Sequence, residues 1–136
     1  MFTRPSLLRG LTEKVKTGFG NMYVTVNFDD KGDPVEVFAT IGKSGKSTMA
    51  KTEALGRLVT LCLQNGVKTE EIIHQLKDIE GESPTPFGTG MVKSIPDGIA
   101  QVLERNKKYP GDVVNADELE IVMPVPNNSN FDEVFP

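Results

Sequence analysis

The stretch MYVTVNFDDKGDPVEVFATI, residues 22–41, decides the fold. From residue 22 to residue 28 apolar side chains alternate with polar or aromatic ones, a pattern typical of a strand with one buried face. Residues 35–41 are again rich in β-branched and aromatic residues. Gly32 lies in the connection, where glycine permits the positive φ of a tight turn. This stretch therefore predicts an antiparallel hairpin.

In the chain before the hairpin, apolar and polar residues alternate weakly over residues 11–17, and Gly18 and Gly20 then indicate a turn. This pattern predicts a third strand. After the hairpin the apolar period changes to that of helices. We expect α+β architecture: a three-stranded antiparallel meander followed by three helices, with an extended C-terminal tail. Residues 1–106 form one domain and residues 107–136 form an acidic, proline-rich tail, in which residues 119–125 are a strand or an extended arm.

Each of the three predicted helices has a recognisable start or end. The first spans residues 48–64 and ends before Gly66, and the second begins at Thr69. The third has Ser94 as its N-cap, and residues 80–91 between the second and third are expected to be a loop. The expected buried positions are Met49, Ala50, Ala54, Leu58, Val59, Leu61 and Cys62 on the first helix, Ile72, Ile73, Leu76 and Ile79 on the second, and Ile99, Ala100, Val102 and Leu103 on the third.

Composition excludes several classes of protein. The net charge of −4 lies entirely in the tail, because basic and acidic residues balance over residues 1–106. This balance argues against general nucleic-acid binding but leaves room for a local basic site. Cys62 is the single cysteine, so a multi-cysteine metal site is excluded and a reducing compartment is expected. No apolar run suits a membrane span or a signal peptide, and we expect a cytoplasmic protein.

The loop GKSGKST, residues 42–48, leads into the first predicted helix. It is not a P-loop, because Thr40 stands where that motif needs glycine. A glycine-rich loop at a helix N-terminus nevertheless presents free backbone N–H groups to anions. The candidate phosphate ligands here are Lys43, Ser44, Lys46 and Ser47, and the alternative is a plain helix N-cap.

Arg57 is a further candidate for holding a phosphate through its planar guanidinium. It follows Glu53 by four residues, so the alternative is an ordinary ion pair on one helix face. Gly56 next to it costs helix stability, which indicates a close approach of another segment or room for a ligand.

A nucleoside site is indicated around the later loop. Phe87 could stack on a base, with Met91 nearby, and Asp97 could accept a hydrogen bond from a ribose hydroxyl if it does not cap its helix. The alternative is that Phe87 fills a small satellite core. Arg105 completes the candidate ligand-binding set.

Catalytic groups are sparse. His74 is the single histidine, and neither it nor Cys62 belongs to a recognisable nucleophile–base arrangement. We therefore expect a binding protein that is not an enzyme and that needs no cofactor or metal.

Five blocks in order resemble the TSCPD domain found at the C-terminus of adenosylcobalamin-dependent ribonucleotide reductases. The blocks are KTGFGNMYVTVN (residues 16–27), EVFATIGKSG (36–45), TEALGRL (52–58), QLKDI (75–79) and SIPDGIA (94–100). The resemblance extends from about residue 10 to 106 and implies the fold. In that family four of the matching places are cysteines that look like metal ligands, whereas this chain has Phe19, Ser47, Gly81 and Ile95 there. The resemblance therefore implies no zinc site and no reductase activity.

Two functions follow as hypotheses. A free-standing domain without these cysteines is similar in size and style to the phage-encoded sponges that sequester cyclic ADP-ribose-type signals and block Thoeris defence. We expect a non-enzymatic nucleotide-binding protein that forms a homo-oligomer, located in the host cytoplasm if phage-encoded. The alternative is an accessory or regulatory domain of an adenosylcobalamin-dependent ribonucleotide reductase.

Overall fold

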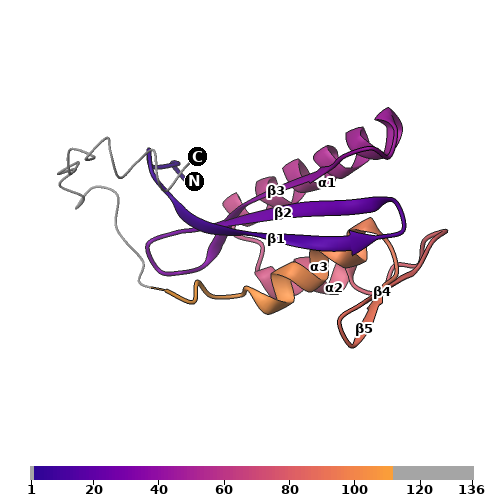
Figure 1. Ribbon diagram of the computed structural model, residues 1–136. Helices are drawn as coiled ribbons and strands as arrows, with labels where there is room; N and C mark the ends of the chain where they lie inside the picture. Colours follow the sequence, from indigo (N-terminus) through magenta and orange to yellow (C-terminus); the bar gives the residue numbers. More distant parts are fainter. Residues whose placement is uncertain (1, 112–136) are drawn as a thin grey trace, which may run out of the picture.

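The structure, a computed structural model, describes residues 2–111. It confirms the predicted α+β class, with a three-stranded antiparallel sheet followed by helices (Figure 1). The elements are β1 (Arg9–Thr17), β2 (Gly20–Phe28), β3 (Pro34–Ile41), α1 (Lys46–Gln64), α2 (Thr69–Leu76), β4 (Thr85–Phe87), β5 (Gly90–Val92) and α3 (Ile95–Arg105). The tail prediction, including residues 119–125, lies outside the described residues apart from positions 107–111.

The large sheet has the order β1-β2-β3, as the meander predicts. Its register pairs Val15 with Met22 and Val26 with Val37, which places the apolar residues of all three strands on one face. That face is buried, whereas Tyr23 and Phe38 on the other face are 45% and 51% exposed. The sheet is therefore covered on one side only.

Helix α3 covers the buried face of the sheet. Its predicted apolar residues are all buried, and Leu103 is fully inaccessible. Gly98 allows the close approach, because a Cβ there would lie 2.9 Å from the Met22 terminal methyl. The predicted N-cap is confirmed, since the Asp97 N–H donates to Ser94 Oγ at 3.2 Å.

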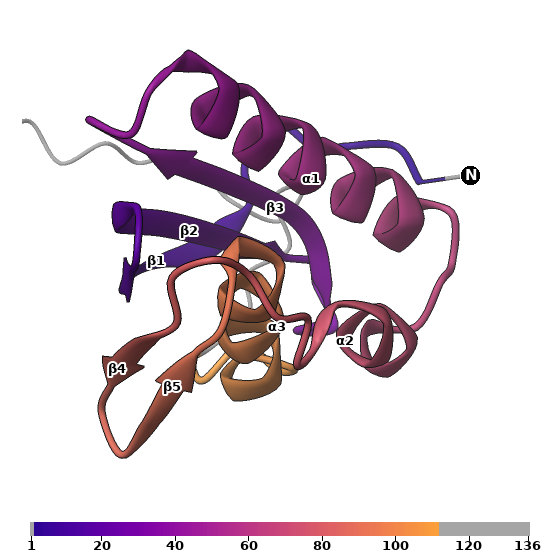
Figure 2. The same ribbon diagram turned by 90° about the vertical axis from the view of Figure 1, so that its right-hand side faces the viewer.

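Helix α1 packs along the free edge of β3, and it runs beside that strand in Figures 1 and 2. A Cβ at Gly56 would lie 3.2 Å from both Ala39 N and Val37 O, which confirms the close approach indicated by this glycine. The Thr60 hydroxyl accepts from Val37 N at 2.9 Å and donates to Val37 O at 3.0 Å. The helix thus satisfies edge groups that would otherwise be open to pairing.

This edge packing overturns the predicted buried face of α1. Leu58 and Leu61 are 59% and 58% exposed, and Met49 is 46% exposed. Ala50 and Ala54 are exposed as well. Val59 is buried as predicted, and the other buried positions are Thr52, Gly56 and Leu63. Contact with a strand edge uses small and hydroxyl side chains, so the most apolar stripe of the helix faces outward.

Two further differences concern the chain after α1. Helix α2 ends at Leu76, so Ile79 lies beyond it and is 41% exposed, contrary to its predicted burial. Residues 80–91 are not simply a loop, because β4 and β5 form a short antiparallel hairpin that pairs Thr85 with Val92. Strands of three residues are too short to produce a readable alternation. Among residues 2–111, each helix is too short or too polar to span a bilayer.

Candidate functional site

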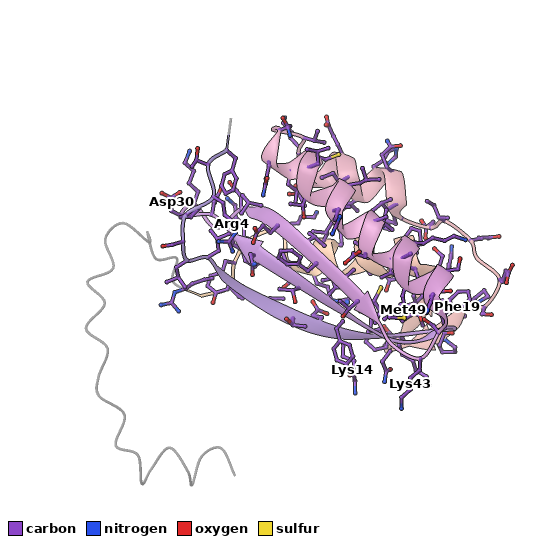
Figure 3. All side chains as sticks on the ribbon, turned by 90° about the horizontal axis from the view of Figure 1, so that it is seen from above. Arg4, Lys14, Phe19, Asp30, Lys43 and Met49 are labelled. Carbon is purple, nitrogen blue, oxygen red and sulfur yellow. The ribbon has the colours of Figure 1, made fainter. Side chains whose placement is uncertain are left out.

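The predicted phosphate loop lies at the solvent-exposed start of α1. Lys43, Lys46 and Ser47 are exposed, and Lys43 points away from the domain (Figure 3). Lys43 and Gly45 have φ values of 60° and 87°, and Gly45 occupies the N-cap position without a side-chain cap. Ser44 Oγ is buried and has no hydrogen-bond partner within the described residues. The predicted phosphate ligands therefore lie around the start of α1, and Lys43, Lys46 and Ser47 face solvent.

Arg57 lies apart from that loop. It is eleven residues beyond Lys46 on one helix, roughly 16 Å along the axis. Its guanidinium is 4.0 Å from the Glu53 carboxylate and both side chains are mostly exposed, which is the ordinary ion pair considered above. Together with Phe38 and Thr40 it lines a hollow of about 270 Å³ between α1 and β3.

Phe87, Met91 and Arg105 do converge. They line one groove of about 510 Å³ between the β4–β5 hairpin and α3, which we call the hairpin groove. In Figure 2 the hairpin lies at the bottom of the view and α1 at the top, so these residues do not meet Lys43 or Arg57. The remaining lining residues are Lys77, Gly88, Thr89, Gly90, Ala100, Gln101 and Glu104.

Asp97 lies behind the hairpin groove and is only 1% exposed. Its carboxylate accepts from Asp78 N and Lys93 N at 2.9 Å each and from Gln101 Nε2 at 3.0 Å. Gln101 Nε2 also donates to Met91 O at 2.8 Å, which ties α3 to β5. Contrary to the expectation of a ribose contact, Asp97 positions the wall of the groove and has no free face toward it.

The cations of the hairpin groove differ in how firmly they are held. Arg105 donates to Glu13 Oε1 from Nε at 3.0 Å and from a terminal nitrogen at 2.9 Å, so β1 fixes its orientation. Lys77 is exposed and makes no ion pair with another described residue. The acidic lining residue, Glu104, is 3.3 Å from Lys107, which offsets its charge. The groove therefore combines an aromatic ring with one fixed and one free cation.

Sequence reasoning did not choose the other lining residues of this groove as ligands, which are Lys77, Gly88, Thr89, Gly90, Ala100, Gln101 and Glu104. Lys77 follows the last residue of α2, and its place depends on how α2 packs against α3. The Gly88-Thr89-Gly90 run was a usable signal, because a glycine-flanked turn between an aromatic and an apolar residue is typical of a short hairpin.

A second groove, the helix groove, lies between α1 and α2 and has a volume of about 740 Å³. Its walls are mainly apolar, and Cys62 is half-buried within them. His74 is exposed on α2, as its predicted polar position implies. The lining residues are Leu55, Leu58, Val59, Cys62, Val67, Glu70, Glu71, Ile72, His74, Gln75 and Leu76.

The segments that carry Phe19 and Gly81, two of the positions where the resemblance implies cysteines, are neighbours. A Cβ at Gly18, the residue before Phe19, would contact Ser83. A Cβ at Gly81 would lie 3.2 Å from Ser94 Cβ, and Ser94 is the residue before Ile95. No three histidine, cysteine, aspartate or glutamate side chains come together as metal ligands would in residues 2–111.

Comparison with known proteins identifies the family of the chain. No curated protein sequence and no solved structure matches the chain. The family model described as the TSCPD domain matches residues 2–107, which includes every helix and strand described above. This chain of 136 residues therefore belongs to the TSCPD domain family.

Proposed function

We propose that this protein is a non-enzymatic nucleotide-binding protein and that the hairpin groove is its site. The observation that carries this proposal is the convergence of Phe87, Met91 and Arg105, from three segments, on one groove. Its volume of about 510 Å³ lies within the usual range for small-molecule sites, about 300–1,000 Å³.

The base and the phosphates of a nucleotide have matching groups in the groove. The half-buried Phe87 ring offers a face for a base, with Met91 as a polarisable neighbour. Lys77 supplies positive charge for phosphate oxygens, and the Arg105 guanidinium, whose charge is balanced by Glu13, adds N–H donors. The Gly88–Gly90 turn adds backbone N–H groups and the Thr89 hydroxyl, and Gly88 has a φ of 62° that glycine adopts without strain.

Sequestration is the use of such a site that we favour. The lining of the hairpin groove holds no nucleophile with an adjacent base, so a bound nucleotide would be retained unchanged. A cyclic ADP-ribose-type signal carries a base, riboses and a diphosphate, which suits a groove with one aromatic ring and two cations. A protein that holds this signal in the cytoplasm of a phage-infected host would block Thoeris defence.

Isothermal titration of the full chain with cyclic ADP-ribose, ADP-ribose and ATP tests this function. We expect at least one to bind, and Phe87→Ala to weaken that binding about tenfold, because base–aromatic stacking contributes about 1–3 kcal/mol. Lys77→Ala should weaken it as well. Phe38→Ala is the matched control, since Phe38 is an exposed aromatic outside the groove.

Two results would contradict the proposal. One is no binding of any of the three nucleotides by a folded chain. The other is binding that Phe87→Ala and Lys77→Ala leave unchanged but that the double variant Lys43→Ala/Lys46→Ala abolishes, which would move the site to the start of α1.

The family match favours a second candidate function. The TSCPD domain is associated with ribonucleotide reductases, so the chain could instead be an accessory or regulatory domain that docks on a separate reductase chain. Mixing the purified chain with an adenosylcobalamin-dependent reductase and measuring the mass of the mixture would detect this. Absence of a complex, together with unchanged reductase turnover, would exclude this alternative.

A further inference from the structure

The outward face of α1 carries an apolar stripe with nothing packed on it among the described residues. We propose that this stripe pairs with the same stripe of a second copy of the chain, with the two α1 helices antiparallel. The stripe consists of Ala50, Ala54, Leu58 and Leu61, all exposed and spaced by four, four and three residues along one helix face. This proposal is independent of nucleotide binding.

The stripe is exposed for a reason that lies in the fold. The opposite side of α1 is occupied by β3, through the close contact at Gly56 and the Thr60 hydroxyl bonds to Val37. A helix held in this way cannot rotate to bury its leucines in its own domain. Leu58 also lines the helix groove, so the stripe and the groove form one apolar surface.

The sizes of the side chains fit a second copy in the antiparallel direction. The N-terminal half of the stripe has only Ala50 and Ala54, and the C-terminal half has Leu58 and Leu61. In an antiparallel pair the small half of each helix faces the large half of the other, and the two-fold symmetry repeats each contact. A parallel pair would oppose leucine to leucine and leave a gap at the alanines.

The charges favour the same direction. Lys51 flanks the alanine half on the side of α2, and Glu70 and Glu71 of α2 line the helix groove beside the leucine half. Antiparallel pairing brings Lys51 of each copy toward these glutamates of the other, while Arg57 on the far side of the stripe is paired with Glu53. Parallel pairing would bring lysines toward lysines, which is unfavourable.

Sedimentation velocity of the full chain over a dilution series tests the pairing. We expect a dimer that dissociates on dilution and a rise of the dissociation constant of about tenfold or more in Leu58→Glu/Leu61→Glu. Phe38→Glu is the matched control, because Phe38 is 51% exposed on the open sheet face and should leave the dimer intact. Circular dichroism confirms that each variant is folded.

A charge exchange tests the direction of the pair. Lys51→Glu should weaken the dimer, and adding Glu71→Lys in the same chain should restore it. A wild-type chain that stays monomeric at every concentration, a dimer that tolerates Leu58→Glu/Leu61→Glu, or a higher oligomer that needs the open sheet face would each overturn the proposal.

Discussion

The two grooves of this domain share α2 as a neighbour but differ in chemistry. The helix groove is lined mainly by aliphatic side chains, with charge only at its α2 rim. The hairpin groove is lined by Phe87, Lys77 and Arg105 and by a glycine-rich turn. Apolar walls without directional groups suit another protein surface, whereas an aromatic face with nearby cations suits a nucleotide. The difference teaches that one small domain can offer separate surfaces for assembly and for ligand binding.

The largest effect we expect comes from the group that holds the hairpin groove together. Asp97→Ala leaves Asp78 N and Lys93 N without their acceptor in a fully buried position. The loss of hydrogen bonds to a buried charge should lower the free energy of unfolding by roughly 3 kcal/mol or more. Urea denaturation measures this loss. Glu104→Gln, an exposed change on the same helix, is the control and should change stability by less than about 0.5 kcal/mol.

A smaller loss is expected where α1 packs on the edge of β3. Gly56→Val would drive a side chain into the β3 backbone, which lies 3.2 Å from a Cβ at that position. Overpacking of this kind costs about 1–3 kcal/mol and should also push α1 outward. Glu53→Val introduces the same side chain at an exposed position of the same helix without the clash. If the two variants unfold at the same urea concentration, α1 does not pack on the strand edge as described.

Thr60→Val is a subtler test of the same contact. The change keeps the shape of the side chain but removes its hydrogen bonds with Val37 N and Val37 O. We expect a loss of about 1–2 kcal/mol and faster amide exchange at Val37, because its backbone groups then lack partners. Unchanged exchange at Val37 by NMR would count against the edge contact.

The smallest effect is expected at Glu36, which belongs to neither groove. A change there should alter stability without altering binding. Burial raises the pKa of Glu36, but hydrogen bonds from Arg4 and Asn27 and the charge of Arg4 outweigh burial and lower its pKa below the ordinary 4.5. Because the folded pKa is depressed, this stabilisation is present above about pH 4.5 and is lost as the pH falls through the folded value. Glu36→Gln should therefore lower the melting temperature at neutral pH, with the difference from wild type closing in acid. Nucleotide binding and dimer formation at neutral pH should be unaffected.

The sequence was a good guide where a helix packs on a sheet face and a poor one where it packs on an edge. In α3 the apolar residues predicted to be buried, such as Ile99 and Leu103, are buried. In α1 the same reasoning chose Leu58 and Leu61, which are exposed, and missed Thr52. Apolar periodicity identifies a surface that excludes water, but it does not say whether the domain itself or another chain covers that surface.

The residues of the candidate site also differ in how far sequence reasoning could place them. Phe87, Met91 and Arg105 were chosen for the distinctive chemistry of their side chains, and they line one groove; their role in binding stays a prediction. Lys77 could not be chosen in this way, since its position depends on the packing of α2 against α3. Asp97 was recognised as notable, but its buried hydrogen bonds to Asp78 and Lys93 depend on contacts that sequence spacing does not define.

Native mass spectrometry of the full chain with a bound nucleotide tests most directly whether the two grooves have different occupants. The account predicts a dimer that carries up to one nucleotide per chain. It further predicts a dimer without nucleotide for Phe87→Ala, and a monomer that still binds nucleotide for Leu58→Glu/Leu61→Glu. Simultaneous loss of the dimer and the nucleotide in both variants would contradict the account, because it would mean that the two surfaces form a single composite site.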